Sequence, residues 1–339
     1  MRRMLVMLVG AMLAVAAVGV RAQEGAQASS DEWGKLAASN DLELKGNTPF
    51  HLAMTFQLFD MDGKPTETGS FEEWWAAPGS SRVVVHLAGL KEDGSAPEGA
   101  APAVVRDDFL VRELIGAAVR PVMAWQRASE TLRDETRKFG KTSLSCVTTV
   151  PGLASGPGVG SETLCTDPQI EDVRAVLESD GNRVVLRNSV GKFHETYVAL
   201  GLQISLLGRS AITGTVTALQ NFDPATSEVK LPPPASESVT PGPEAGHVPA
   251  QVMAGRRLSF VEPNYPDRAK MQHQSGKVIL GVVIGADGAV HALTPIASTD
   301  AMFTDTATEA VKKWKYSPYL LNGVPTEVDT TITVSFQVN

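Results

Sequence analysis

Residues 277–296 read KVILGVVIGADGAVHALTPI, and this stretch decides how the C-terminal part of the chain folds. Two runs rich in β-branched and apolar residues, 277–284 and 289–296, flank the turn sequence Gly285-Ala286-Asp287-Gly288. Glycine and aspartate adopt the backbone conformations that a tight connection between antiparallel strands requires. The stretch therefore predicts two neighbouring antiparallel strands.

A helix is predicted after these two strands. Its apolar side chains recur at i, i+4, i+7, i+8 and i+11, which is one stripe at helical spacing: Phe303, Ala307, Ala310, Val311 and Trp314. Thr299 or Asp300 is placed to cap its start. Lys312, Lys313 and Lys315 are expected in the last turn, where the helix dipole favours cations.

The last residues of the chain alternate between apolar and polar side chains with a period of two. Val328, Thr330, Ile332, Val334, Phe336 and Val338 alternate with Asp329, Thr331, Thr333, Ser335, Gln337 and Asn339. This pattern predicts a final strand over 328–339 with one buried and one solvated face.

Several motifs in this region resemble the TonB C-terminal domain family in order and spacing. Upstream of the strands, Pro263-x-Tyr265-Pro266-x-x-Ala269 leads into a short helical turn over 267–272, which Gly276 is expected to end. The other motifs are Gly276-x-Val278, Asp287-Gly288-x-Val290, Ala310-Val311-x-x-Trp314-x-Tyr316-x-Pro318 and Asn322-Gly323-x-Pro325. The resemblance covers residues 256–339.

The resemblance implies a small antiparallel sheet packed by two helices, which captures an extended peptide by strand addition. The family's peptide is the TonB box of an outer-membrane receptor. The candidate docking edge is the final strand, with Val328, Thr330, Thr331, Ile332, Thr333, Val334, Ser335 and Phe336 as its site residues. We expect Tyr265, Trp314 and Tyr316 to be packing residues. Asp287, Gly288, Asn322 and Gly323 are expected to form turns.

Residues 41–225 are expected to form an α+β domain. Strands are predicted at 50–59, 68–75, 82–87, 182–188, 195–200 and 211–222, with Gly181 and Gly191 at turns. One or two helices are predicted within 107–139, where Pro121 interrupts the pattern. In element order the region loosely resembles the periplasmic lipoprotein-carrier half-barrels, which are curved antiparallel sheets with helices on the concave face. That resemblance implies an alternative function, the carriage of a lipid or another apolar ligand.

Cys146 and Cys165 are the only cysteines in the chain. Such a pair at short range predicts a disulfide in an oxidising compartment, with two free thiols as the alternative. The intervening residues are rich in glycine, proline and serine, so we expect a loop closed by the bridge.

The N-terminal sequence resembles an export signal. Arg2 and Arg3 precede the apolar run Met4–Val20, and Val20-Arg21-Ala22 resembles a signal-peptidase site. We expect residues 1–22 to be a cleaved signal peptide, which predicts a periplasmic, cell-envelope protein. The alternative is an uncleaved inner-membrane anchor. A polar tether follows over 23–40, and a proline-rich linker is expected over 226–255.

Charge and motif content restrict the function further. The net charge of −8 argues against nucleic acid as a partner. The six histidines are dispersed, and the chain lacks HExxH, GxSxG, P-loop and CxxC motifs, so we expect no enzyme, no cofactor and no metal site. The expected partner is an outer-membrane TonB-dependent receptor or another envelope protein, and an inner-membrane motor complex if the N-terminus is uncleaved. A structural envelope scaffold is a third alternative. The apolar run contains no histidine and the linker is short, which leaves coupling to the proton-motive force open.

Overall fold

The computed structural model describes residues 35–36, 38–44, 46–97, 99–121, 130–139, 141–150, 162–170, 172–178, 182–234, 253, 256–321 and 323–338. The predicted signal peptide, most of the tether and most of the linker lie outside these residues. Within this part of the chain, no helix is both long enough and apolar enough to cross a membrane.

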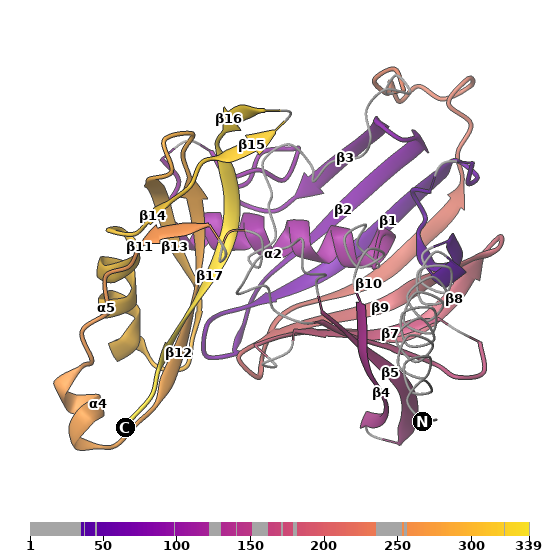
Figure 1. The fold of residues 1–339 in the computed structure, drawn as a ribbon. Helices are drawn as coiled ribbons and strands as arrows, with labels where there is room; N and C mark the ends of the chain where they lie inside the picture. Colours follow the sequence, from indigo (N-terminus) through magenta and orange to yellow (C-terminus); the bar gives the residue numbers. More distant parts are fainter. Residues whose placement is uncertain are drawn as a thin grey trace, which may run out of the picture.

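A ten-stranded sheet, called the large sheet below, occupies the N-terminal two thirds of the chain. Its strands are β1 (Phe50–Phe59), β2 (Pro65–Ala77), β3 (Ser80–His86), β4 (Glu130–Phe139), β5 (Thr142–Val150), β6 (Glu162–Thr166), β7 (Val173–Glu178), β8 (Arg183–Phe193), β9 (Thr196–Leu206) and β10 (Arg209–Asn221). They are ordered β3-β2-β1-β10-β9-β8-β7-β6-β5-β4, and neighbouring strands pair antiparallel. The sheet curves strongly around one side (Figure 1).

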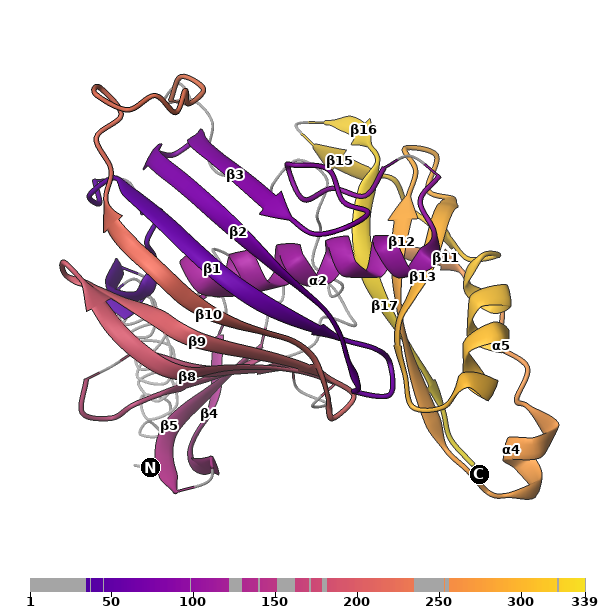
Figure 2. The same cartoon turned by 180° about the vertical axis from the view of Figure 1, so that it is seen from behind.

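Helix α2 (Pro102–Val119) crosses the concave side of the large sheet (Figure 2). Pro102 stands in its first turn, where a missing N–H removes no helical hydrogen bond. Leu110, Val111 and Leu114 are fully buried and share one core with the alternating inward residues of β1, which has the sequence FHLAMTFQLF. Gly214 of β10 admits this close packing, because a Cβ there would crowd the Leu114 side chain.

One helix of the one or two predicted within 107–139 is present, and the end of that segment is a strand instead. Helix α2 ends at Val119, residues 122–129 lie outside the described part, and Glu130–Phe139 is strand β4. The sequence of β4, ETLRDETRKF, has no apolar stripe at helical spacing, and its pairing with β5 determines its conformation instead. The six strands predicted in this region are present, but β8 runs through Gly191, and the turn after it is formed by His194 and Glu195. Gly181 is outside the description.

The disulfide between Cys146 and Cys165 is present, with a Cα–Cα distance of 4.0 Å. The two cysteines are directly opposite each other on β5 and β6, and both are fully buried. The expected loop is therefore shorter than predicted, because its two ends are paired strands. Residues 151–161 lie outside the described part.

The C-terminal part of the chain forms a three-stranded antiparallel sheet, called the small sheet below. Its order is β13 (Val290–Ser298), β12 (Gly276–Ile284) and β17 (Val328–Phe336). Helix α5 (Ala301–Val311) packs on one face, and the short helix α4 (Asp267–Met271) precedes β12. Two separate two-stranded sheets lie in the same part of the chain. One pairs β11 (Arg257–Ser259) with β14 (Lys315–Tyr316), and the other pairs β15 (Tyr319–Leu321) with β16 (Val324–Thr326).

The structure refines the predicted ends of these elements. The Asp300 side chain caps α5 by accepting the Met302 N–H at 3.0 Å. The helix ends at Val311, so the three lysines follow its last turn rather than belonging to it. Gly276 opens β12 and does not end α4, and β17 stops at Phe336, before Val338.

Candidate functional site

Strand β17 is the edge of the small sheet. It pairs with β12 over nine residues, from Ile284 opposite Val328 to Gly276 opposite Phe336. Among the described residues no other strand pairs with it. The predicted docking strand is therefore placed at an edge, which is the position that strand addition requires.

The backbone groups of β17 that face the free edge follow from the hydrogen bonds of β12. The Lys277 N–H donates to the Thr299 hydroxyl and the Lys277 carbonyl accepts the Thr299 N–H, both at 2.9 Å, on the β13 side. Backbone direction alternates along an antiparallel strand, so the even-numbered residues of β12 point toward β17. They pair with the even-numbered residues of β17. The N–H and C=O groups of Asp329, Thr331, Thr333 and Ser335 consequently point away from β12.

The side chains of the predicted site residues divide between two faces. Five of them are buried beneath the helix side of the sheet: Val328, Thr330, Ile332, Val334 and Phe336. Thr331 is half-buried, and Thr333 and Ser335 are exposed. The exposed side chains of this strand are thus small hydroxyl residues, and most of its accessible hydrogen-bonding groups belong to the backbone.

Aromatic residues anchor the end of β17. The Phe336 ring lies 4.8 Å from Phe303 of α5 and 5.8 Å from Tyr265, between ring centroids. The Tyr265 hydroxyl donates to the Gln274 carbonyl at 2.7 Å, and the indole N–H of Trp314 donates to the Val261 carbonyl at 2.9 Å. These contacts agree with the prediction that Tyr265 and Trp314 are packing residues.

Charged groups lie at the two ends of the small sheet. Asp329, the first edge-facing residue of β17, accepts a hydrogen bond from Arg112 of α2 at 2.9 Å. At the β12–β13 turn, a hydrogen bond from the Ala289 N–H is the main cause that lowers the pKa of Asp287.

Tyr316 is buried as predicted, and burial raises the pKa of its hydroxyl to about 12.

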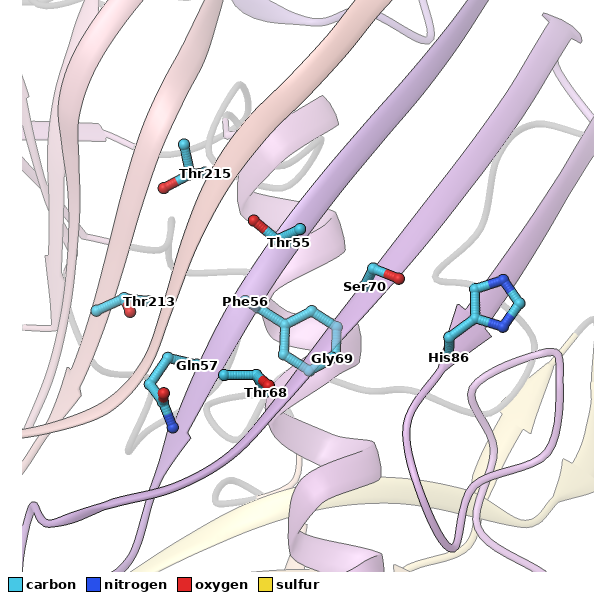
Figure 3. Close-up of a pocket in the computed structure, with 9 residues that line it drawn as sticks. All are labelled: Thr55, Phe56, Gln57, Thr68, Gly69, Ser70, His86, Thr213 and Thr215. Atoms are coloured by element: carbon cyan, nitrogen blue, oxygen red, sulfur yellow. The ribbon is translucent and has the colours of Figure 1, made fainter.

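A second feature is a shallow depression of about 510 Å³ on the convex face of the large sheet (Figure 3). Its lining side chains are mainly polar: Thr55, Gln57, Thr68, Ser70, His86, Thr213 and Thr215, with the Phe56 ring beside Gly69. No sequence pattern predicts this depression, since its residues come from four strands that only the fold brings together. The described residues contain no group of three or more His, Cys, Asp or Glu side chains placed to hold a metal ion.

The C-terminal part of the chain is thus a small antiparallel sheet with helices on one face and an edge strand that pairs with no other described strand. Comparison with known families identifies this arrangement. Residues 261–338 match the family described as Gram-negative bacterial TonB protein C-terminal, and this segment is a TonB C-terminal domain.

The chain is also similar to individual proteins of known sequence or structure. Protein TonB of Vibrio cholerae serotype O1 is 32% identical over 109 residues, which are 32% of this chain and 42% of that protein. The chain thus spans less than half the length of this curated relative. The solution structure of the TonB C-terminal domain of Pseudomonas aeruginosa is 24% identical, with 24% of this chain and 85% of that chain covered and a TM-score of 0.22. A putative outer-membrane lipoprotein-sorting protein domain from Vibrio parahaemolyticus is 10% identical, with 62% and 95% covered and a TM-score of 0.35.

Proposed function

We propose that this chain is an exported envelope protein whose TonB C-terminal domain binds an extended peptide segment by strand addition at β17. The observation that carries this proposal is the edge position of β17, with the backbone groups of four residues directed away from β12. Main-chain hydrogen bonds supply the affinity in this binding mode. The hydroxyl side chains of Thr333 and Ser335 leave room for an incoming backbone.

The proposed partner is an outer-membrane TonB-dependent receptor or another envelope protein, and binding contributes to transport across the envelope. The TonB relative from Vibrio cholerae supports this kind of partner. The proposed arrangement is a cleaved signal peptide of residues 1–22, a tether over 23–40, a domain over 41–225, a linker over 226–255 and the TonB domain over 256–339. An uncleaved N-terminus would add an inner-membrane motor complex to the partners. The proposal assigns no enzymatic activity and no cofactor.

A second candidate function is the carriage of an apolar ligand by the large sheet. The concave face of that sheet is lined by large apolar side chains, among them Phe50, Leu52, Phe71 and Trp75, and helix α2 crosses it. This candidate would use a different surface from β17, so both functions can belong to one chain.

Replacing Thr333 by proline tests the strand-addition proposal. Proline removes the edge-facing N–H of residue 333 and leaves the hydrogen bonds of β17 to β12 intact. Thr333→Val is the matched control, because it changes the side chain and keeps the N–H. With a synthetic peptide covering the TonB box of a receptor from the same bacterium, we expect at least about tenfold weaker binding by Thr333→Pro, corresponding to one lost hydrogen bond plus steric exclusion.

Thr333→Val should bind the same peptide as the unmodified chain does. Circular dichroism of both variants verifies that the small sheet is folded. Equal affinity of the folded Thr333→Pro variant and the unmodified chain would refute strand addition at this edge.

A further inference from the structure

Helix α2 is shared between the large sheet and the TonB C-terminal domain. Its buried side chains pack into the concave face of the large sheet, while its N-terminal half meets the face of the small sheet that α5 does not cover (Figure 2). Ile279, Ile296 and Ala297 of the small sheet belong to the same hydrophobic core as Leu110 and Leu114 of α2. The two parts of the chain therefore bury apolar surface against each other through one helix.

Two arginines of α2 bind the TonB domain directly. Arg106 is 7% exposed, and its Nε donates to the Ile296 carbonyl of β13 at 2.8 Å. Arg112 lies between two carboxylates, Asp108 of α2 at 2.8 Å and Asp329 of β17 at 2.9 Å. Asp107 lies 3.6 Å from the Arg106 guanidinium as an ion-pair partner, and the Ile296 carbonyl supplies a further compensating contact for this buried cation.

Two further cations join the TonB domain to the large sheet outside α2. Arg209, at the start of β10, donates to the carbonyls of Ser298 at 2.9 Å and Thr299 at 3.2 Å. Lys277 of β12 donates to the Asn182 side chain beside β8 at 2.7 Å. These contacts hold the small sheet against the rim of the large sheet. Movement of α2 away from the large sheet therefore requires the small sheet to move as well.

We infer that the TonB C-terminal domain holds α2 on the concave face of the large sheet, and that undocking this domain opens the face to an apolar ligand with the dimensions of an acyl chain. The helix covers a strip about 27 Å long, from its 18 residues at about 1.5 Å each. Beneath it lie Phe50, Met54, Phe56 and Leu202, all buried. Carriage of an apolar ligand by the large sheet then depends on whether the TonB C-terminal domain is docked.

Strand β17 links this inference to the proposed peptide site. It carries both the edge-facing backbone and Asp329, the partner of Arg112. A peptide that binds the undocked TonB domain more tightly than the docked one would favour release of α2. By linkage, an apolar ligand bound between α2 and the large sheet would increase the affinity for that peptide. This last step rests on strand addition, whereas the role of the TonB domain in holding α2 does not.

Ile279→Glu in the full chain tests the inference without any peptide. Ile279 is 4% exposed at the interface with α2 and points away from the α5 side of the small sheet, so the charge separates the two parts without entering the core of the TonB domain. Ala292→Glu on β13 is the matched control, because Ala292 is exposed. The measurements are hydrogen–deuterium exchange of residues 102–119 and the fluorescence of N-phenyl-1-naphthylamine added to the protein.

We expect Ile279→Glu to raise amide exchange in α2 at least tenfold and to increase dye fluorescence, while amides of β1, β10 and α5 stay protected. Ala292→Glu should change neither signal. Arg106→Met, which alters only the helix side of the contact, should shift both signals in the same direction by a smaller factor. Unchanged α2 exchange in both Ile279→Glu and Arg106→Met would overturn the inference, as would simultaneous loss of protection in α2, β1 and β10. A failure of Thr333→Pro to weaken peptide binding would leave these outcomes unaffected.

Discussion

Gly288, in the turn between β12 and β13, is the position where one added methyl group should disturb the TonB domain most. Its φ angle is +76°, in the left-handed region that favours glycine. A Cβ at this position would overlap the backbone carbonyl oxygen of Tyr316, and the Tyr316 N–H donates to the Gly288 carbonyl at 2.8 Å. The turn is thus packed against β14 by its backbone, and no flexible side chain is available to move aside.

The expected cost of Gly288→Ala has three parts. The left-handed conformation costs an alanine about 1 kcal/mol, and the broken hydrogen bond to Tyr316 costs about 1 kcal/mol. Displacement of β14 adds a strain comparable to overpacking, about 1–3 kcal/mol. Gly323→Ala is the matched control, because Gly323 has a φ angle of +83° but no atom within 4 Å of the added Cβ. That control should lose only the conformational part, about 1 kcal/mol.

Urea denaturation of the full chain, followed by circular dichroism, measures both variants against the unmodified protein. We expect the transition of the TonB domain to shift by about 3–5 kcal/mol for Gly288→Ala and by about 1 kcal/mol for Gly323→Ala. Amide exchange of β12 identifies which transition belongs to this domain. Equal losses for the two variants would refute the packing argument, because both share the left-handed strain and differ only in the contact with Tyr316.

Three other predictions follow from buried groups. Phe303→Ala should cost about 3–5 kcal/mol in the urea transition of the TonB domain, because the ring is fully buried against Tyr265 and Phe336; a loss below 1 kcal/mol would contradict this packing. Double replacement of Cys146 and Cys165 by serine should lower the unfolding free energy of the large sheet by about 3 kcal/mol, measured by the same denaturation, for a loop of sequence separation 19; unchanged stability would contradict a structural role of the bridge. Burial raises the pKa of Tyr316 to about 12, above the value near 10 of an unfolded tyrosine, so its contribution to stability is complete below pH 10 and is lost as the pH rises toward 12. Absorbance at 295 nm should show an ionisation near pH 12 that Tyr316→Phe removes, and its persistence in that variant would refute the assignment.

Much of the TonB domain could be predicted from the sequence, because its signals are local. Alternation over 328–336 predicted both the strand and its buried face, and the apolar stripe from Phe303 to Trp314 predicted α5. The direction of the edge-facing backbone groups could not be predicted. It depends on the hydrogen bonds between Lys277 and Thr299, which only the folded pairing of β12 and β13 determines.

The large sheet was harder to predict, for two physical reasons. Strand β4 is polar along most of its length, so neither a period of two nor a period of 3.6 in apolar residues marks it. The contact between α2 and the small sheet joins residues about 190 positions apart, such as Arg106 and Ile296. No local pattern encodes such a contact, and Arg106 has the appearance of an ordinary surface cation in the sequence.

Strand β4 ends the large sheet on one side, and six of its ten residues are charged. Charged side chains at a sheet edge oppose pairing with a second copy, because pairing would remove part of their hydration. The tendency of the purified protein to aggregate should therefore depend on the charges of this strand. Exchanging its charged residues for threonine would favour visible precipitation at concentrations where the natural chain stays clear, even though no core contact is changed.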